Sequence, residues 1–223
     1  MSWLDQGFEI VPKVLDRSTV SSLIRAVEGS SVRRSRAGMR HALEIPAVKS
    51  LASSPKLLAI AKHVLGDHAF PFRATLFDKS LRSNWLVVWH QDTALPLRER
   101  KEVKGWGSWS RKEGVLCAHA PASALEQVLA VRVHLDDSTS ENGALRVLPG
   151  THNMGVLADD AILELAQRTK AVECPVDSRG VLLMRPLMVH ASSKSINESR
   201  RRVLHIEYAA TRCLPGGLEL CCA

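Results

Sequence analysis

Two potential metal ligands, His90 and Asp92, lie two positions apart at the end of an apolar run, residues 84–90. Alternate side chains of a β-strand face the same side, so we expect His90 and Asp92 to share one face while Gln91 points away. An imidazole and a carboxylate, joined by a second imidazole, form the two-histidine, one-carboxylate set that leaves three metal positions open. The triplet alone is a weak signal, because it also fits a strand-end histidine beside a solvated aspartate.

A second imidazole, His190, follows the apolar run 180–189, and Arg201 opens another strand-like run eleven residues later. A histidine that closes one strand and an arginine that opens the next can face one cavity. Such a pair would hold a dicarboxylate that chelates the metal at one end and pairs with the guanidinium at the other. Ser192 could add a hydroxyl to this clamp. The alternative is a core histidine followed by a solvated arginine run, residues 200–202.

Further polar residues are candidates for the same cavity. Arg132 and His134 alternate with valines in the run 129–135. They are solvated if the valine face packs between two sheets, and they contact substrate or cosubstrate if they point into a barrel. His152, after a Pro-Gly turn, is a rival third metal ligand.

Period-two spacing places Asn84, Leu86 and Val88 on the face of His90 and Asp92. Asn84 is therefore expected either to line the site or to be a hydrogen-bonded amide of the β framework.

Four of the five tryptophans fall within 25 residues of one another, around this triplet. Trp106 and Trp109 lie after it, in a charged segment, residues 93–128. They fit two roles equally well, namely a lid that stacks on substrate and an anchor that pins a long loop to the core.

Helical and strand-like segments divide the chain. Apolar spacing and capping residues predict helices that begin near Asp16 or Ser18 and after Ser54, with a third over 158–168. Strand-like runs dominate from residue 72 onward and predict two packed sheets; they are 72–77, 84–90, 129–135, 144–148, 180–186 and 202–208. Asn142-Gly143 predicts a hairpin between the third and fourth runs.

Composition limits the function classes. The chain has 30 Lys+Arg against 23 Asp+Glu, a net charge of +7, and 45% hydrophobic residues, which excludes a disordered polycationic tail. The basic residues concentrate in two clusters, which are Arg33, Arg34, Arg36 and Arg40, and Arg98, Arg100, Lys101 and Lys104. Such clusters are either solvated or serve an anionic partner, for example a CoA thioester, a phosphate ester or nucleic acid.

Cysteine usage and hydropathy indicate a compartment. The five cysteines are odd in number and form no CxxC pair, which favours a reducing environment. The N-terminus has no signal-peptide pattern, and no apolar run approaches about 18 residues. We expect a cytoplasmic protein without a membrane span, and the sequence gives no indication of its oligomeric state.

Three segments together resemble the phytanoyl-CoA dioxygenase family of iron(II)/2-oxoglutarate oxygenases. They are WHQD at 89–92, NGALRVLPGTH at 142–152 and HASSKSINESRRRVLHIEY at 190–208. The resemblance implies a mainly β fold, a double-stranded β-helix (jelly roll, cupin-like) with N-terminal flanking helices. We expect one domain over 1–223, with a helical flank (1–70), a jelly-roll core (71–210) and an excursion (93–128).

The resemblance also implies the site. His90, Asp92 and His190 would bind Fe(II), and Arg201, with Ser192, would hold the distal carboxylate of the cosubstrate 2-oxoglutarate. The choice of Arg201 over its two neighbours depends on the offset from His190. The PGTH motif is usually structural in the family, which favours His190 over His152. Halogenating relatives replace the carboxylate ligand by a small residue, so Asp92 favours hydroxylation.

The expected function is O2-dependent oxidation, most simply hydroxylation, of a small metabolite, with release of succinate and CO2. An anionic metabolite would account for the basic clusters. One rival is a basic nucleic-acid or protein-binding jelly roll with a vestigial metal site, which the small aromatic content disfavours. Another is a cupin-like metalloenzyme that does not use 2-oxoglutarate.

Overall fold

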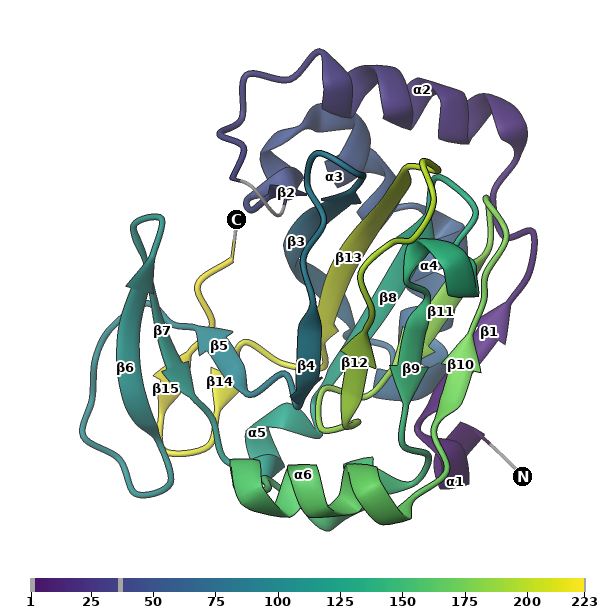
Figure 1. Ribbon diagram of the computed structural model, residues 1–223. Helices are drawn as coiled ribbons and strands as arrows, with labels where there is room; N and C mark the ends of the chain where they lie inside the picture. The colour runs from purple at the N-terminus through teal and green to yellow at the C-terminus, as the bar shows by residue number, and fades with distance from the viewer. Residues whose placement is uncertain (1–2, 36–37, 223) are drawn as a thin grey trace.

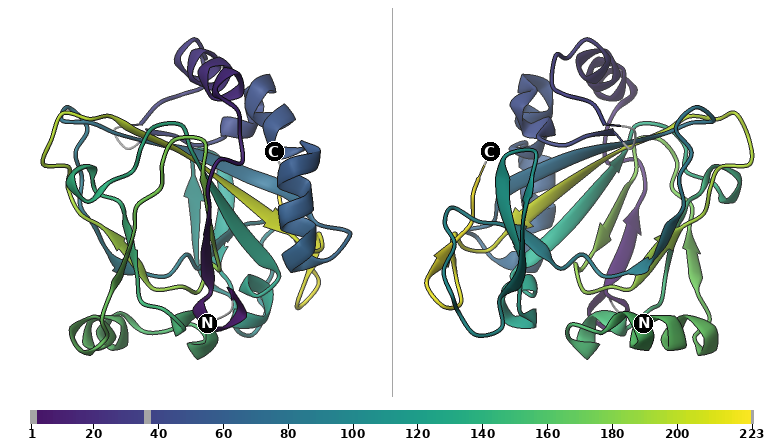
Figure 2. Two further views of the ribbon diagram at one scale, coloured as in Figure 1. Left: turned by 90° about the vertical axis from the view of Figure 1, so that its right-hand side faces the viewer. Right: turned by 60° about the vertical axis from the view of Figure 1, so that its left-hand side comes forward.

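Two antiparallel sheets face each other across the centre of the protein (Figures 1 and 2). The computed structural model describes residues 3–35 and 38–222, so Arg36 of the first basic cluster lies outside the described part. The larger sheet comprises, in spatial order, β1 (Phe8–Val11), β11 (Val181–Met184), β8 (Val128–His134), β13 (Arg201–Ala209), β3 (Phe70–Lys79) and β2 (Gly38–Met39). The smaller sheet comprises β10 (Val172–Cys174), β9 (Leu145–Val147), β12 (His190–Ser192) and β4 (Val87–His90).

Helices cover the outer face of the larger sheet (Figure 2). The N-terminal helices are α1 (Trp3–Gln6), α2 (Arg17–Glu28), the 3-10 turn η1 (Ala42–Glu44), α3 (Pro46–Ala52) and α4 (Pro55–Leu65). As expected, the Asp16 side chain caps α2 through the amide of Thr19, and Ser54 caps α4. Their apolar faces form one core with Leu76, Val131 and Ile206 of the sheet. The expected helical flank also contributes a strand, β1, to the edge of the sheet.

The remaining helical segments lie in the second half of the chain. They are α5 (Ala122–Leu125), η2 (Ser140–Asn142), η3 (Thr151–Met154) and α6 (Asp159–Arg168). Helix α6 packs Ile162 and Leu165 against Leu148 and Val189, below the ends of the strands of the smaller sheet (Figure 1). None of the described helices is both long and apolar enough to cross a lipid bilayer.

The segment expected to be an excursion, residues 93–128, contains a small three-stranded sheet between residues 94 and 119. Strand β7 (Val115–His119) pairs with β5 (Ala94–Pro96) on one side and β6 (Gly107–Lys112) on the other. The C-terminal hairpin of β14 (Cys213–Leu214) and β15 (Leu218–Glu219) adds Leu214 and Leu218 to the same apolar cluster. The two faces of the small sheet are not equally buried, and its strands contain polar and charged residues. The sequence therefore shows little of the alternation that predicts a strand.

The predicted hairpin at Asn142-Gly143 is wrong. Gly143 adopts the left-handed conformation (φ 78°) at the end of η2, and the chain crosses there from β8 in the larger sheet to β9 in the smaller one. The Asn142 side chain accepts a hydrogen bond from the Thr139 amide and donates to the Asp137 carbonyl. Its buried amide therefore stabilises a corner between sheets and not a two-residue turn.

Candidate metal centre

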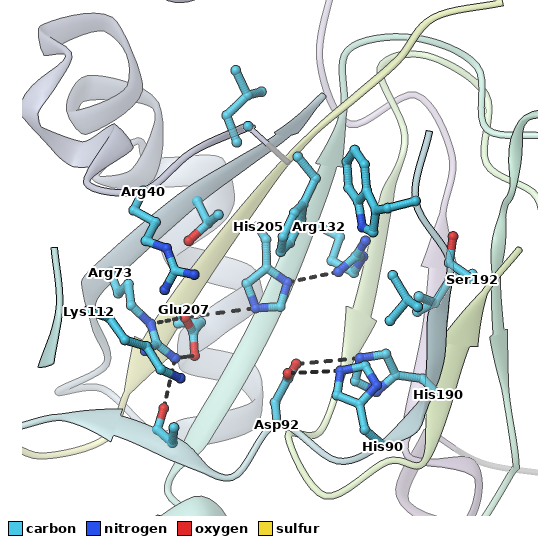
Figure 3. Close-up of a pocket in the computed structure, with 18 of the residues that line it drawn as sticks. Arg40, Arg73, His90, Asp92, Lys112, Arg132, His190, Ser192, His205 and Glu207 are labelled. Atoms are coloured by element: carbon cyan, nitrogen blue, oxygen red, sulfur yellow. Dashed lines mark hydrogen bonds and ion pairs between the residues drawn. The ribbon is translucent and has the colours of Figure 1, made fainter. Parts of the chain in front are cut away.

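His90, Asp92 and His190 converge inside one end of the space between the two sheets (Figure 3). His90 and His190 are directly paired across β4 and β12, and their ring centroids lie 4.2 Å apart. The Nε2 atoms of His90 and His190 lie 3.6 and 3.7 Å from the two carboxylate oxygens of Asp92. One potential ligand atom from each residue lies within 4.8 Å of the others. This donor set and spacing fit an iron ion.

Backbone carbonyls fix both imidazoles in the orientation that a metal needs. His90 Nδ1 lies 2.8 Å from the carbonyl of Val88, and His190 Nδ1 lies 2.9 Å from that of Met188. An Nδ1–H that donates to a carbonyl leaves Nε2 as the unprotonated ligand atom, and both Nε2 atoms face Asp92.

The protonation states suit metal binding as well. Burial lowers the pKa of His190 to about 4, so this imidazole is neutral at neutral pH. Burial also raises the pKa of Asp92, but His190 and His90 outweigh that effect and hold it well below its usual range. The carboxylate in turn raises the pKa of His90 in spite of burial. Because an imidazole must be unprotonated at the atom that binds a metal, metal binding at His90 would compete with its protonation.

A β-bulge corrects the expected face of residues 84–90. The pairing of β4 with β12 shifts between His90↔His190 and Val87↔Ser192, which places Val87 and His90 on the cavity side. Leu86 and Val88, expected on that side, are 55% and 64% exposed. Asn84 does not line the cavity; its amide pairs with the backbone of Ser195.

Gln91 holds the segment between the two ligands in place. Its Nε2 donates to the carbonyls of Gly155 and Leu187 at 2.9 and 2.8 Å, and its Oε1 accepts from the amide of Leu157 at 2.9 Å. The side chain is buried, and its three partners come from the chain on both sides of α6. Gln91 is therefore a positioning residue for His90 and Asp92.

Arg201 lies in the same cavity, whereas its two neighbours do not. Its side chain is buried, Nε donates to the carbonyl of Asn142, and Nη2 lies 3.4 Å from Ser192 Oγ. Among the described residues its Nη1 is buried without a hydrogen-bond partner. Arg200 and Arg202 point to the other side of β13, where they pair with acidic residues. The unpaired guanidinium edge of Arg201 is thus free to bind a carboxylate.

Lys79, which the sequence patterns did not single out, places a second positively charged group next to the guanidinium of Arg201. It is directly opposite Arg201 in the pairing of β3 with β13, and its Nζ donates to Ser192 Oγ at 2.9 Å and to the carbonyl of Ser193. Burial, with Arg201 and Arg132 nearby, lowers the pKa of Lys79 to about 7. Like charges opposite each other in a sheet are unfavourable, so the pair is suited to an anion.

Arg132 also lines the cavity, as one of the two alternatives predicts. The valines of β8 pack outward against the helices, so Arg132 and His134 point inward and are 5% and 2% exposed. Arg132 Nη1 donates to His205 Nδ1 at 3.0 Å, and its Nε has no partner among the described residues. His134 lies deeper and does not line the cavity. Burial, together with Arg132 and Arg201, keeps the pKa of His134 well below its usual value.

Trp106, Trp109 and His152 lie away from the cavity. Trp106 is buried in the cluster of the small sheet and donates from Nε1 to the carbonyl of Pro215. Trp109 packs on the same cluster, with Arg100 over its ring. The structure therefore favours the anchor over the lid for both tryptophans. His152, on η3, lines a different cavity together with Arg185.

The far side of the cavity carries residues that the sequence analysis missed. Glu207 is directly opposite Arg73 in the sheet and binds its guanidinium through both carboxylate oxygens, and His205 Nε2 lies 3.9 Å from Glu207 Oε2. His205 and Glu207 alternate with Arg201 along β13, so the period of two could have identified them.

Comparison with known proteins identifies the framework. The nickel- and 2-oxoglutarate-bound structure of HygX from Streptomyces hygroscopicus superposes with a TM-score of 0.66 at 17% identity, covering 93% of this chain and 84% of that one. The chain is 28% identical over 134 residues to L-proline trans-4-hydroxylase of Streptomyces griseoviridis, covering 60% of this chain and 41% of that one. It is 25% identical over 188 residues to a probable alpha-ketoglutarate-dependent hypophosphite dioxygenase of Stutzerimonas stutzeri.

The chain spans about half the length of these two curated relatives, 41% of the first and 56% of the second. The structural similarity confirms the expected jelly-roll fold. A sequence model of phytanoyl-CoA dioxygenase matches residues 3–203, nearly the whole chain. The chain belongs to the phytanoyl-CoA dioxygenase family.

Proposed function

We propose that this protein is an Fe(II)/2-oxoglutarate-dependent oxygenase that hydroxylates a small metabolite. The observation that carries the proposal is the joint placement of a His90–Asp92–His190 donor set and the unpaired edge of Arg201 in one cavity. The cavity has a volume of about 420 Å³, which limits the substrate to a small molecule once the cosubstrate is bound. The two curated relatives are named for a hydroxylation of L-proline and an oxidation of hypophosphite.

Each residue has a defined part in the reaction. His90, Asp92 and His190 would hold the iron on one face, leaving three positions for 2-oxoglutarate and O2. Arg201 and Ser192 would bind the distal carboxylate, with Lys79 supplying a second positive charge behind the serine. Bound iron supplies the activation of O2. One oxygen atom enters the substrate as a hydroxyl group, and the other enters succinate as 2-oxoglutarate loses CO2.

The basic clusters do not favour nucleic acid. Arg34 of the first cluster forms an ion pair with Asp78, and outside the clusters Arg200 and Arg202 pair with Asp78, Glu28 and Asp136. In the second cluster, Arg98, Arg100 and Lys101 pair with Glu219, Glu102 and Glu99. Much of the positive charge is thus neutralised on the surface, and a small-molecule substrate remains the better interpretation.

All five cysteines are free, which supports the proposed cytoplasmic location.

The proposal is tested by succinate formation from 2-oxoglutarate with Fe(II) and O2, measured by NMR, in the parent and in Asp92→Ala. Loss of a ligand should lower the rate by more than about 100-fold, because even changes outside the ligand set cost 10–100-fold. Asp159→Ala, an exposed aspartate at the start of α6, is the matched control and should behave as the parent. Parent-like turnover in Asp92→Ala, with no halide or formate added, would contradict the assignment.

A further inference from the structure

The cavity carries more positive charge than iron and 2-oxoglutarate require. Five cationic side chains line it, which are Arg40, Arg73, Lys112, Arg132 and Arg201, against two carboxylates, Asp92 and Glu207. Fe(II) and the 2-oxoglutarate dianion cancel each other in charge. An excess of positive charge therefore remains along the loaded cavity, and an anionic group on the substrate would neutralise part of it.

The excess lies at the end opposite the proposed cosubstrate clamp. In Figure 3, Arg40, Arg73 and Lys112 lie on one side of Asp92, and Ser192 lies on the other. Arg73 is already neutralised, because Glu207 binds it through two oxygens. Arg40 and Lys112 are the cations of this end that remain available.

Within the described part of the chain, neither of these two cations has a strong ion-pair partner. Arg40 Nε is 3.6 Å from Glu113, which is longer than a hydrogen bond, and its side chain is 48% exposed. Lys112, at the end of β6, is exposed and has no ion pair with any residue of the ranges 3–35 and 38–222. Both residues also line a neighbouring cavity of about 330 Å³. They therefore flank the point where the two cavities meet.

We propose that the substrate carries an oxyanion group and that Arg40 and Lys112 bind this group at the outer end of the cavity. This inference rests on the proposed function. Arg40 comes from the loop before η1 and Lys112 from the small sheet, so two segments outside the facing sheets supply the specificity. A guanidinium and an ammonium group, each able to move at the surface, can bind a carboxylate or a phosphorus oxyanion equally. The reacting part of the substrate then lies toward Asp92.

The test measures succinate formed above the substrate-free rate by holoenzyme loaded with Fe(II) and 2-oxoglutarate. One arm compares propionate, butyrate and cyclopentanecarboxylate with their neutral amides. The other compares hypophosphite, phosphite and ethylphosphonate with diethyl ethylphosphonate. We expect anions of at least one arm to stimulate turnover at least about tenfold more than the neutral compounds, and the arm that succeeds identifies the oxyanion.

Variants then locate the group. Arg40→Gln and Lys112→Gln should each raise the KM of the stimulating anion about tenfold, the effect of losing one charge-assisted hydrogen bond. Arg33→Gln and Lys104→Gln remove exposed charges from the same two segments without touching the cavity, and should leave KM unchanged.

Three results would overturn the inference: equal stimulation by neutral compounds, an unchanged KM in both cavity variants, or no stimulation by any anion while succinate still forms. A complete absence of 2-oxoglutarate turnover in the parent would instead refute the proposed function itself. The two failures are therefore distinguishable.

Discussion

Replacing Arg201 by Gln removes a guanidinium whose Nη2 lies near Ser192 and whose Nη1 is buried without a partner among residues 3–35 and 38–222. The free protein should tolerate this change, because burial next to Arg132 already disfavours the charge and lowers the pKa of Arg201 to about 9. The loss should appear when 2-oxoglutarate binds, since its distal carboxylate then lacks its main partner.

The size of the effect follows from burial. Truncating one member of a buried, hydrogen-bonded charge pair costs about 2–5 kcal/mol. Ser192 still lines the cavity and the charge of Lys79 lies behind it, so we expect a loss of about 3 kcal/mol, or roughly 150-fold in the Kd of 2-oxoglutarate. Lys79 cannot replace Arg201, because its Nζ lies behind Ser192, where it donates to the serine Oγ and to the carbonyl of Ser193.

Calorimetric titration of the Ni(II)-loaded protein with 2-oxoglutarate measures this Kd without turnover. Arg200→Gln and Arg202→Gln are matched controls, since these side chains pair with Asp78 and Asp136 outside the cavity. Their Kd should stay within about threefold of the parent value, although each will lose some stability. A parent-like Kd in Arg201→Gln, or an equal loss in Arg202→Gln, would refute the reasoning.

Two further predictions concern Lys79 and Gln91, which position or polarise residues of the site. Burial lowers the pKa of Lys79 to about 7, and a bound dianion favours its charged form, so 2-oxoglutarate should bind with proton uptake. Its affinity should fall by up to about tenfold per pH unit as pH rises from about 7 to 9. Titrations in buffers of different ionisation enthalpy measure the proton uptake, and Lys79→Met should abolish this pH dependence. Gln91→Leu removes three hydrogen bonds, to Gly155, Leu157 and Leu187. In urea titrations this variant should have a free energy of unfolding about 3 kcal/mol lower than the parent, and it should also bind Fe(II) more weakly. Gln167 is an exposed residue of α6, and Gln167→Leu should have neither effect.

Residue spacing along the strands predicted much of the site. Arg132 and His134 on β8, and Arg201 on β13, share the cavity side because a strand alternates its faces without exception where it is regular. The same rule, applied to all of β13 and β3, would have added His205, Glu207, Arg73 and Lys79. These residues escaped attention because a charged residue in a strand is usually solvated, and only the sheet register shows that Arg73 and Lys79 lie opposite Glu207 and Arg201 on the adjacent strand.

The features that sequence reasoning missed depend on contacts between distant segments. The bulge in β4 exchanges the faces of Leu86 and Val87, and it arises from pairing with β12, about a hundred residues away. Asn142-Gly143 has the composition of a hairpin, but the chain changes sheets there because β8 pairs with β11 and β13 instead. Trp106 is an anchor because the C-terminal hairpin packs on it. The intrinsic preferences of neighbouring residues contain no information about these contacts between distant segments.

A crystal structure of the protein soaked without oxygen in Fe(II) and 2-oxoglutarate tests the central claim most directly. The account predicts iron bound directly by Nε2 of His90, Nε2 of His190 and a carboxylate oxygen of Asp92. It also predicts the distal carboxylate of 2-oxoglutarate on Arg201 and Ser192. Iron bound elsewhere, for example by His152, or a distal carboxylate placed on Arg40 and Lys112, would contradict it.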